Sequence, residues 1–366
     1  MTATVDAKGL SVLFEEFPYP VTADSGKIVI GGDFVDIHGL NLSSPTGGGL
    51  TLNGSANRAE DGSYHPNVTV TNAAVPIDAL LLSALGDEAE QLLIDMGVTG
   101  LLTVKGEVFQ KQGMDEPDLK LAVEMTGGRT TPYKGRVTLD EVKGQFNITS
   151  ERLTDLFLTG KRGKDVVDIE GSVDWSKDDA TTADLSFYFK VEEFTPHWFQ
   201  VHPTDSEQRK QLTEMKKEYE HEGKFTGSID WQPKPGDEPD GFEARIDPDR
   251  LAFNLLGGRL DFNRMSGTVV VYSDLMQLNN LKGEFNSPGP AGEKGYLQAS
   301  GDITFDDEPR IGLELSAESN EIGDTTRLLL PDAVVSVMDA IEYKGMLSVQ
   351  GCLLYTSPSP RDKIHD

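Results

Sequence analysis

A long internal repeat is the feature that most constrains the fold of this chain. The apolar spacing of residues 4–42 returns in residues 245–283 at a constant offset, 266 − 25 = 241. The matched positions are Ser25, Gly26, Ile28, Ile30, Phe34, Ile37 and Leu40 in the first copy and Ser266, Gly267, Val269, Val271, Leu275, Leu278 and Leu281 in the second. Residues 100–106 likewise return as residues 345–351, at 345 − 100 = 245. A repeat unit is incomplete alone and buries its apolar face by continuing its neighbour.

A weaker copy lies between these two. Residues 143–148 occupy the position of the Ser-Gly turn, and residues 223–227 occupy the position of the closing strand. The period is therefore about half of the 241-residue offset. We expect three repeats, which are residues 1–109, a divergent copy at 110–231, and residues 232–351.

The last residues have a different character from the rest of the chain. Residues 352–366, which begin Cys-Leu-Leu-Tyr-Thr-Ser-Pro, look like a translated sequencing adapter, and the match to the first copy stops at Gly351. We therefore predict that residues 352–366 are a non-native tail, exclude them from the fold prediction, and expect the natural protein to continue beyond this fragment. Met1 leads into a polar stretch without a signal-peptide pattern, so we expect the N-terminus to be internal as well.

Charge and composition exclude several function classes. The net charge is -28, and no cluster of Lys and Arg with interleaved aromatic residues offsets it, so nucleic acid is an unsuitable partner. An anionic membrane surface is disfavoured for the same reason. The only cysteine is Cys352, which leaves no disulfide, thiol catalyst or cysteine metal site before the tail. No apolar run reaches the roughly 18 residues of a membrane-spanning helix.

The local patterns predict a mainly β fold with a few helices. Alternating apolar residues indicate strands with one apolar and one solvated face, for example at residues 119–125, 167–175, 185–191 and 311–315. Turn signals such as Glu60-Asp61-Gly62 and Thr126-Gly127-Gly128 favour antiparallel hairpins. We expect one amphipathic helix per repeat, at about 78–96 with Asp78 as its N-cap, at about 206–222 where the sequence is highly charged, and at about 324–341.

The chemical motifs of enzymes and metal sites are missing. The chain has no Gly-x-Ser-x-Gly turn, and His197, His202 and His221 do not form a His-Glu-x-x-His motif. The segment Asp237–Gly241 lacks the ligand spacing of a calcium loop. We therefore expect no catalytic residue, no metal and no cofactor.

The apolar strand faces exceed what the helices can cover, since a helix of about 15 residues is only about 22 Å long. Two arrangements would account for the apolar strand faces that the helices leave uncovered. The sheet could close on itself and fill its interior with side chains. Alternatively, it could stay open as a trough whose inner face meets an apolar ligand. The pattern of residues leaves both open.

The order of elements resembles the C-terminal repeats of AsmA-like proteins, a family related to the TamB-like envelope proteins. The best match is Leu275–Gly283, then Gly295–Gly301 and the segment Leu328–Pro331. The first copy follows the same order but has Gly86 in place of Pro331, and the middle copy replaces the Leu-rich segment with charge. The resemblance implies an elongated antiparallel sheet that forms a curved groove in the periplasm of a double-membrane envelope. It also implies an inner-membrane anchor outside this fragment and envelope membrane proteins as candidate partners.

On this resemblance we expect the chain to bind phospholipid and conduct it between the membranes, without enzymatic activity. The candidate groove-lining residues are those of the most apolar alternating runs: Leu119, Leu121, Val123, Leu185, Phe187, Phe189, Ile311, Leu313 and Leu315. An ordinary closed core is the simplest alternative for these residues. Two other functions are a scaffold for outer-membrane protein assembly, which would use a sheet edge, and a glycan-binding repeat with exposed aromatics such as Tyr188, Trp198 or Trp231.

Overall fold

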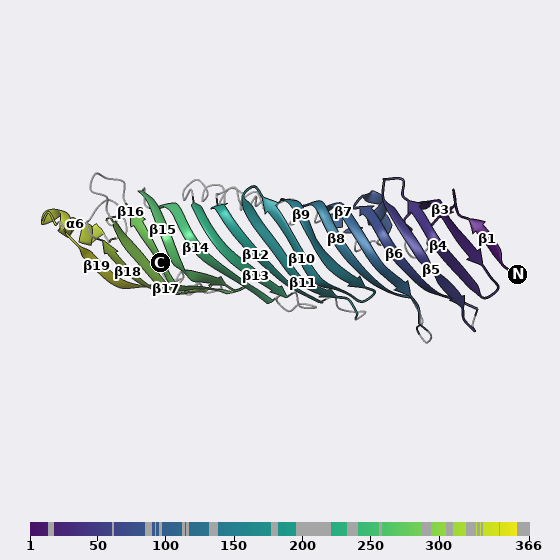
Figure 1. Ribbon diagram of the computed structural model, residues 1–366. Helices are drawn as coiled ribbons and strands as arrows, with labels where there is room; N and C mark the ends of the chain where they lie inside the picture. Colours follow the sequence, from purple (N-terminus) through teal and green to yellow (C-terminus); the bar gives the residue numbers. More distant parts are fainter. Residues whose placement is uncertain are drawn as a thin grey trace, which may run out of the picture. The chain divides into compact units, whose positions relative to one another are not determined.

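The fold is seen in a computed structural model (Figure 1). It describes residues 1–13, 18–60, 62–84, 90–91, 93–94, 97–111, 114, 117–131, 138–176, 182–194, 221–232, 241–255, 258–286, 294–304, 310–319, 327, 330, 332–343 and 345–356. The expected fold class is confirmed at the coarse level, because the described residues form 19 strands of one antiparallel sheet and two helices.

The chain divides into two compact units. The N-terminal unit comprises residues 1–162, 167–185 and 233–238, and the C-terminal unit comprises residues 163–166, 186–232 and 239–366. These units reflect packing in space, so the division into three sequence repeats remains a prediction.

Most strands of the N-terminal unit pair with the next strand in the chain (Figure 1). Its elements are β1 (Ala3–Asp6), β2 (Ser11–Val12), β3 (Val21–Ile30), β4 (Phe34–Ser43), β5 (Gly49–Arg58), β6 (Tyr64–Pro76), α1 (Ala79–Ala84), β7 (Thr99–Phe109), β8 (Asp118–Thr130), β9 (Leu139–Thr149), β10 (Arg152–Arg162) and most of β11 (Asp165–Asp174). The first two strands both pair with β3, on different halves of that strand.

The C-terminal unit has the same hairpin topology. It contains most of β12 (Thr182–Phe194), then β13 (Glu222–Gln232), β14 (Gly241–Leu255), β15 (Gly258–Val271), β16 (Leu275–Asn286), β17 (Lys294–Thr304), β18 (Arg310–Ser319), α6 (Asp332–Ala340) and β19 (Leu347–Thr356). Each strand from β13 to β19 is antiparallel to the next.

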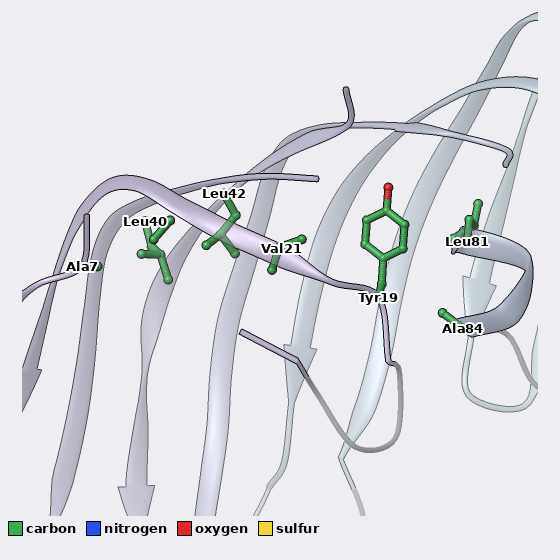
Figure 2. Packing of buried hydrophobic residues seen from close by; sticks show 8 residues of the cluster. Ala7, Tyr19, Val21, Leu40, Leu42, Leu81 and Ala84 are labelled. Carbon is green, nitrogen blue, oxygen red and sulfur yellow. The ribbon is translucent and has the colours of Figure 1, made fainter. Parts of the chain in front are cut away.

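A packed core lies at one end of the N-terminal unit, where α1 and the N-terminal segment cover β3 and β4 (Figure 2). Its buried residues are Ala7, Tyr19, Val21, Ala23, Leu40, Leu42, Leu81 and Ala84. Asp78 begins α1 as predicted, since the N–H groups of Leu80 and Leu81 each donate to its Oδ1 at 3.0 Å. Desolvation acts to raise the pKa of Asp78, but hydrogen bonds from Thr46 and these two N–H groups outweigh it, so the pKa lies below its ordinary value.

The packed core of the C-terminal unit is aromatic. Leu260, Phe262 and Phe285 are at most 4% exposed, and the two phenyl rings meet edge to face with centroids 6.2 Å apart. The ring of Phe285 occupies the space beside Gly295, where an added Cβ would lie 2.4 Å from Cζ of Phe285. Close packing of this kind fixes the register of β15, β16 and β17.

Several special backbone conformations recur at the offsets of the sequence match. Gly39 and Asn280 both have left-handed φ, 54° and 49°, at bulges of β4 and β16, and 280 − 39 = 241. Gly97 and Glu342 both have left-handed φ, 56° and 50°, and 342 − 97 = 245. Each ends a helical turn in the same way, because Val98 N–H donates to the Leu93 carbonyl at 3.1 Å and Tyr343 N–H donates to the Met338 carbonyl at 3.0 Å.

Some predicted boundaries were wrong. Thr126-Gly127-Gly128 is no turn but part of β8, where the register shifts between Met125 and Gly128 and left-handed φ at Gly127 serves a bulge. Glu222, the expected end of the middle helix, begins β13, and residues 206–220 lie outside the described residues.

The extents predicted for the other two helices fall partly outside the described residues. Regular helix α1 ends at Ala84, although Glu90, Gln91, Leu93 and Ile94 are also helical. Helix α6 spans Asp332–Ala340, so Ile341 follows it and the start expected near residue 324 lies outside the described residues.

The fold prediction does not cover the tail, but its first residues lie in the sheet. Strand β19 continues through Cys352 to Thr356 and pairs with Glu314 to Arg310 of β18. The reason is that the residues after Gly351 are rich in apolar and β-forming types, which suit a strand beside an existing edge.

Candidate apolar binding face

One face of the N-terminal unit is apolar across most of its strands. Residues directly opposite one another on paired strands point to the same face. From β4 to β8 one such row is Ile37, Gly54, Val68, Val108 and Leu119. The next row along the strands is Leu40, Leu52, Val70, Gly106, Leu121 and Ile148. The alternation predicted from the sequence therefore becomes a two-dimensional apolar surface.

This N-terminal apolar face is only partly covered. Leu40 is 5% exposed under the packed core, whereas Leu52, Val70 and Leu121 of the same row are only partly buried. Val123 and Met125, further along β8, are buried at 5% and 4%. The open part of the face thus runs beside the packed core.

The structure brings the predicted residues of β8 together on this face. Leu119 pairs with Val108, Leu121 pairs with Gly106 and Ile148, and Val123 pairs with Val104 and Phe146. Leu119 and Leu121 are partly exposed and could meet a ligand, but Val123 is buried and is a core residue.

Leu185 belongs to the same unit and lies beside a glycine of β11. A Cβ placed on Gly171 would be 3.1 Å from Cα of Leu185, a close approach like that between Gly106 and Leu121, where the corresponding distance is 2.9 Å. Leu185 is partly buried.

The C-terminal unit has its own apolar face. Ile311 pairs with Ile303, Leu313 with Gly301 and Leu315 with Ala299. Ile303 and Gly301 pair in turn with Met276 and Leu278 of β16. All three predicted residues of β18 are partly exposed, so this face is also incompletely covered.

Phe189 lies on the C-terminal apolar face as well. Its ring fills the space beside Gly227, where an added Cβ would be 2.6 Å from Cε2, and it meets Phe225 edge to face at 5.8 Å. Phe187 is two residues earlier in β12 and therefore points to the same side. Both phenylalanines are partly buried.

The opposite faces are polar and hold exposed ion pairs. Lys224 of β13 contacts Glu192 at 3.2 Å and Asp249 at 3.5 Å, and Lys190 contacts Glu192 at 2.7 Å. Hydrogen bonds from Lys190 and then Lys224 lower the pKa of Glu192, and the bond to Glu192 raises the pKa of Lys224. Exposed pairs of this kind add little stability but keep a sheet face soluble.

Sequence reasoning missed several residues of the apolar faces. Val68, Val108 and Ile148 in the N-terminal unit and Leu278 and Ile303 in the C-terminal unit share rows with the predicted residues. In the strands of Val108 and Ile303, Gly106 and Gly301 interrupt the apolar run. Counting a glycine as an apolar position would have found these two residues.

Other kinds of site are missing from what the structure describes. Among the described residues no group of three or more His, Cys, Asp and Glu side chains could hold a metal ion. Within the same residues no helix has the length and apolar character needed to cross a membrane. Of the aromatics considered for glycan binding, Tyr188 is 45% exposed, Trp231 is partly exposed and Trp198 lies outside the described residues.

Comparison with protein-family profiles, with curated proteins and with solved structures found no match to this chain.

Proposed function

We propose that this chain is part of an AsmA-like envelope protein whose apolar sheet faces bind the acyl chains of phospholipid and conduct them between the inner and outer membranes. The observation that carries the proposal is the incomplete cover over ordered apolar rows in each unit. Leu121 and Leu313 stand in such rows and remain partly exposed, whereas Phe285 in a packed core is 1% exposed. An apolar surface left open in a folded protein needs a partner that removes it from water.

Acyl chains fit this surface chemically. The open parts of both faces are lined by Leu, Ile, Val and Phe side chains with glycines between them, and the charged residues Lys120, Glu124 and Glu314 of β8 and β18 stand on the opposite face. Such a surface offers no directional polar contact, so it would select for hydrocarbon and not for a particular head group. The polar outer face, with the net charge of -28, would keep the protein soluble in the periplasm.

The proposal treats the chain as consecutive repeats that build a curved groove. The recurrent left-handed positions, Gly39 with Asn280 and Gly97 with Glu342, support the repeat because they preserve backbone geometry where side chains differ. In this proposal the anchor and envelope partners belong to the longer protein.

The test is to purify the full chain from a bacterial periplasm, extract it with organic solvent and measure bound lipid by mass spectrometry. We expect phospholipid in stoichiometric amount. Leu121→Asp in the N-terminal unit and Leu313→Asp or Phe187→Asp in the C-terminal unit should each reduce it, since a carboxylate on the apolar face opposes hydrocarbon.

Matched controls separate binding from folding. Lys120→Asp and Ser316→Asp place the same carboxylate in β8 and β18 but on the polar faces. These two variants should retain lipid. A folded protein without lipid, or equal lipid loss in the control and apolar-face variants, would refute the proposal and favour an ordinary closed core.

A further inference from the structure

The polar face of the N-terminal unit contains a hollow that the proposed lipid function does not use. The hollow has a volume of about 230 Å³ and lies over β7, β8 and β9 beside the bulge of β10. Its lining side chains are those of Thr103, Lys105, Ala122, Glu124, Gln145, Asn147 and Asp155. Val123 and Phe146, whose side chains point to the apolar face, complete the lining.

The register explains why a hollow forms there. Ala122 stands between Lys105 and Asn147 in one cross-strand row, and Glu124 stands between Thr103 and Gln145 in the next. Ala122 has the shortest side chain of these, so it forms a low floor surrounded by longer polar groups. The hollow is therefore a consequence of one small residue on a central strand.

Its polar groups converge from four strands and offer both donors and acceptors. Lys105 and the amide of Gln145 can donate, and Glu124 and Asp155 can accept. Asp155 is held in place, because Asn147 Nδ2 donates to its Oδ2 at 2.8 Å and the Thr154 hydroxyl donates to the same oxygen at 3.2 Å. The bulge between Thr154 and Phe157, where Asp155 has φ of 51°, brings this carboxylate to the rim.

An exposed aromatic ring stands next to the hollow. Phe157 pairs directly with Gln145, so it lies on the polar face at the end of the row Thr103, Glu124 and Gln145. It is 43% exposed, and the residue directly opposite it on β9 is the polar Gln145. An apolar ring in such surroundings gains stability when a flat apolar surface covers it.

We propose that this hollow binds a neutral saccharide. Carboxylates can accept hydrogen bonds from sugar hydroxyls, amides can both accept and donate, and the phenyl ring of Phe157 can stack on the apolar C–H face of a sugar ring. One cation and two carboxylates make the hollow net acidic, so phosphate and sulfate groups fit poorly. The site goes beyond the proposed lipid function, because it lies on the opposite face of the same strands.

The experiment uses the full chain in two steps. A microarray of neutral, sulfated and phosphorylated glycans is followed by calorimetric titration with N-acetylglucosamine, glucose and galactose trisaccharides. A single shallow subsite implies a Kd of about 1 mM. Ala122→Leu, which fills the hollow, should raise the Kd at least tenfold, and Phe157→Ala should raise it about tenfold.

Two further variants keep the test decisive. Glu124→Gln preserves shape but removes a charged acceptor, so it should weaken binding if the hollow is the site. Thr69→Leu adds a leucine to the same polar face on β6, outside the hollow, and should leave binding unchanged. Absence of binding to any neutral glycan at 10 mM, a preference for anionic glycans, or equal effects of Ala122→Leu and Thr69→Leu would each overturn the proposal. Lipid content measured on the same samples distinguishes this failure from failure of the lipid proposal.

Discussion

Replacement of Gly106 by alanine should open the sheet between β7 and β8. Gly106 has φ of 154°, a region nearly restricted to glycine, and an added Cβ would lie 2.0 Å from the carbonyl oxygen of Lys120 and 2.9 Å from Cα of Leu121. Backbone strain of about 1–3 kcal/mol is therefore joined by the loss of one or two ladder hydrogen bonds at about 1 kcal/mol each. We expect a total cost of about 2–5 kcal/mol.

Gly127→Ala in β8 is the matched control for this prediction. Gly127 has φ of 59°, and an added Cβ would meet no heavy atom within 4 Å, so only left-handed strain of about 1 kcal/mol remains. Hydrogen exchange measured by mass spectrometry over residues 99–130 should show about 5- to 1000-fold less protection in Gly106→Ala than in Gly127→Ala, which corresponds to about 1–4 kcal/mol. Equal protection in the two variants would refute the idea that close strand approach requires this glycine.

Glu342→Gly should raise the free energy of unfolding by about 1 kcal/mol in urea denaturation, because it relieves left-handed strain at a helix end where the equivalent residue is already Gly97. Asp78→Ala should lower it by about 1 kcal/mol through loss of the N-cap. Although desolvation opposes ionisation of Asp78, its hydrogen bonds keep the pKa low, so this difference is complete above the ordinary aspartate pKa and disappears as the pH falls through the lowered value. Phe285→Ala should cost about 3–5 kcal/mol by emptying the aromatic core, and a cost below 1 kcal/mol in urea would contradict its role there.

The strands could be predicted because their signal is local. Alternation in residues 119–125 places one side chain after another on the same face whatever strand lies next to it. The turn predicted at Thr126-Gly127-Gly128 failed because glycine serves left-handed φ equally well in a turn and in a bulge. Only the register of β8 against β9 distinguishes these two uses, and register depends on residues far away in the sequence.

Helix ends were harder to predict for a related reason. The apolar stripe continues to Ile341, but the chain leaves the helix at Ala340 and takes a left-handed turn at Glu342. Glutamate is an unusual residue at that position, so the sequence carries no glycine signal there. Comparison with Gly97 in the first copy was the available clue.

The candidate site was only partly predictable because the burial of an apolar side chain depends on residues that are distant in the sequence. Leu121 and Val123 carry the same alternating signal on the same strand, yet the first is partly exposed and the second is 5% exposed. An apolar row is buried where other side chains pack over it, as in the cluster of Met125, Leu139 and Val142 or in the core that contains α1. The periodicity of β8 does not encode this packing. Alternation identifies the apolar face, and the fold decides which part of that face stays open.

The two proposed ligands would share strands without sharing atoms. Leu121 and Ala122 are neighbours in β8, but the pleat sends their side chains to opposite faces, one toward the apolar rows and the other toward the polar hollow. A bound acyl chain and a bound sugar would therefore be separated by the thickness of one strand, and each could be lost without loss of the other. This separation follows from the alternation of side chains between the two faces of a strand. The lipid experiment and the saccharide experiment therefore test two independent binding sites on the same sheet.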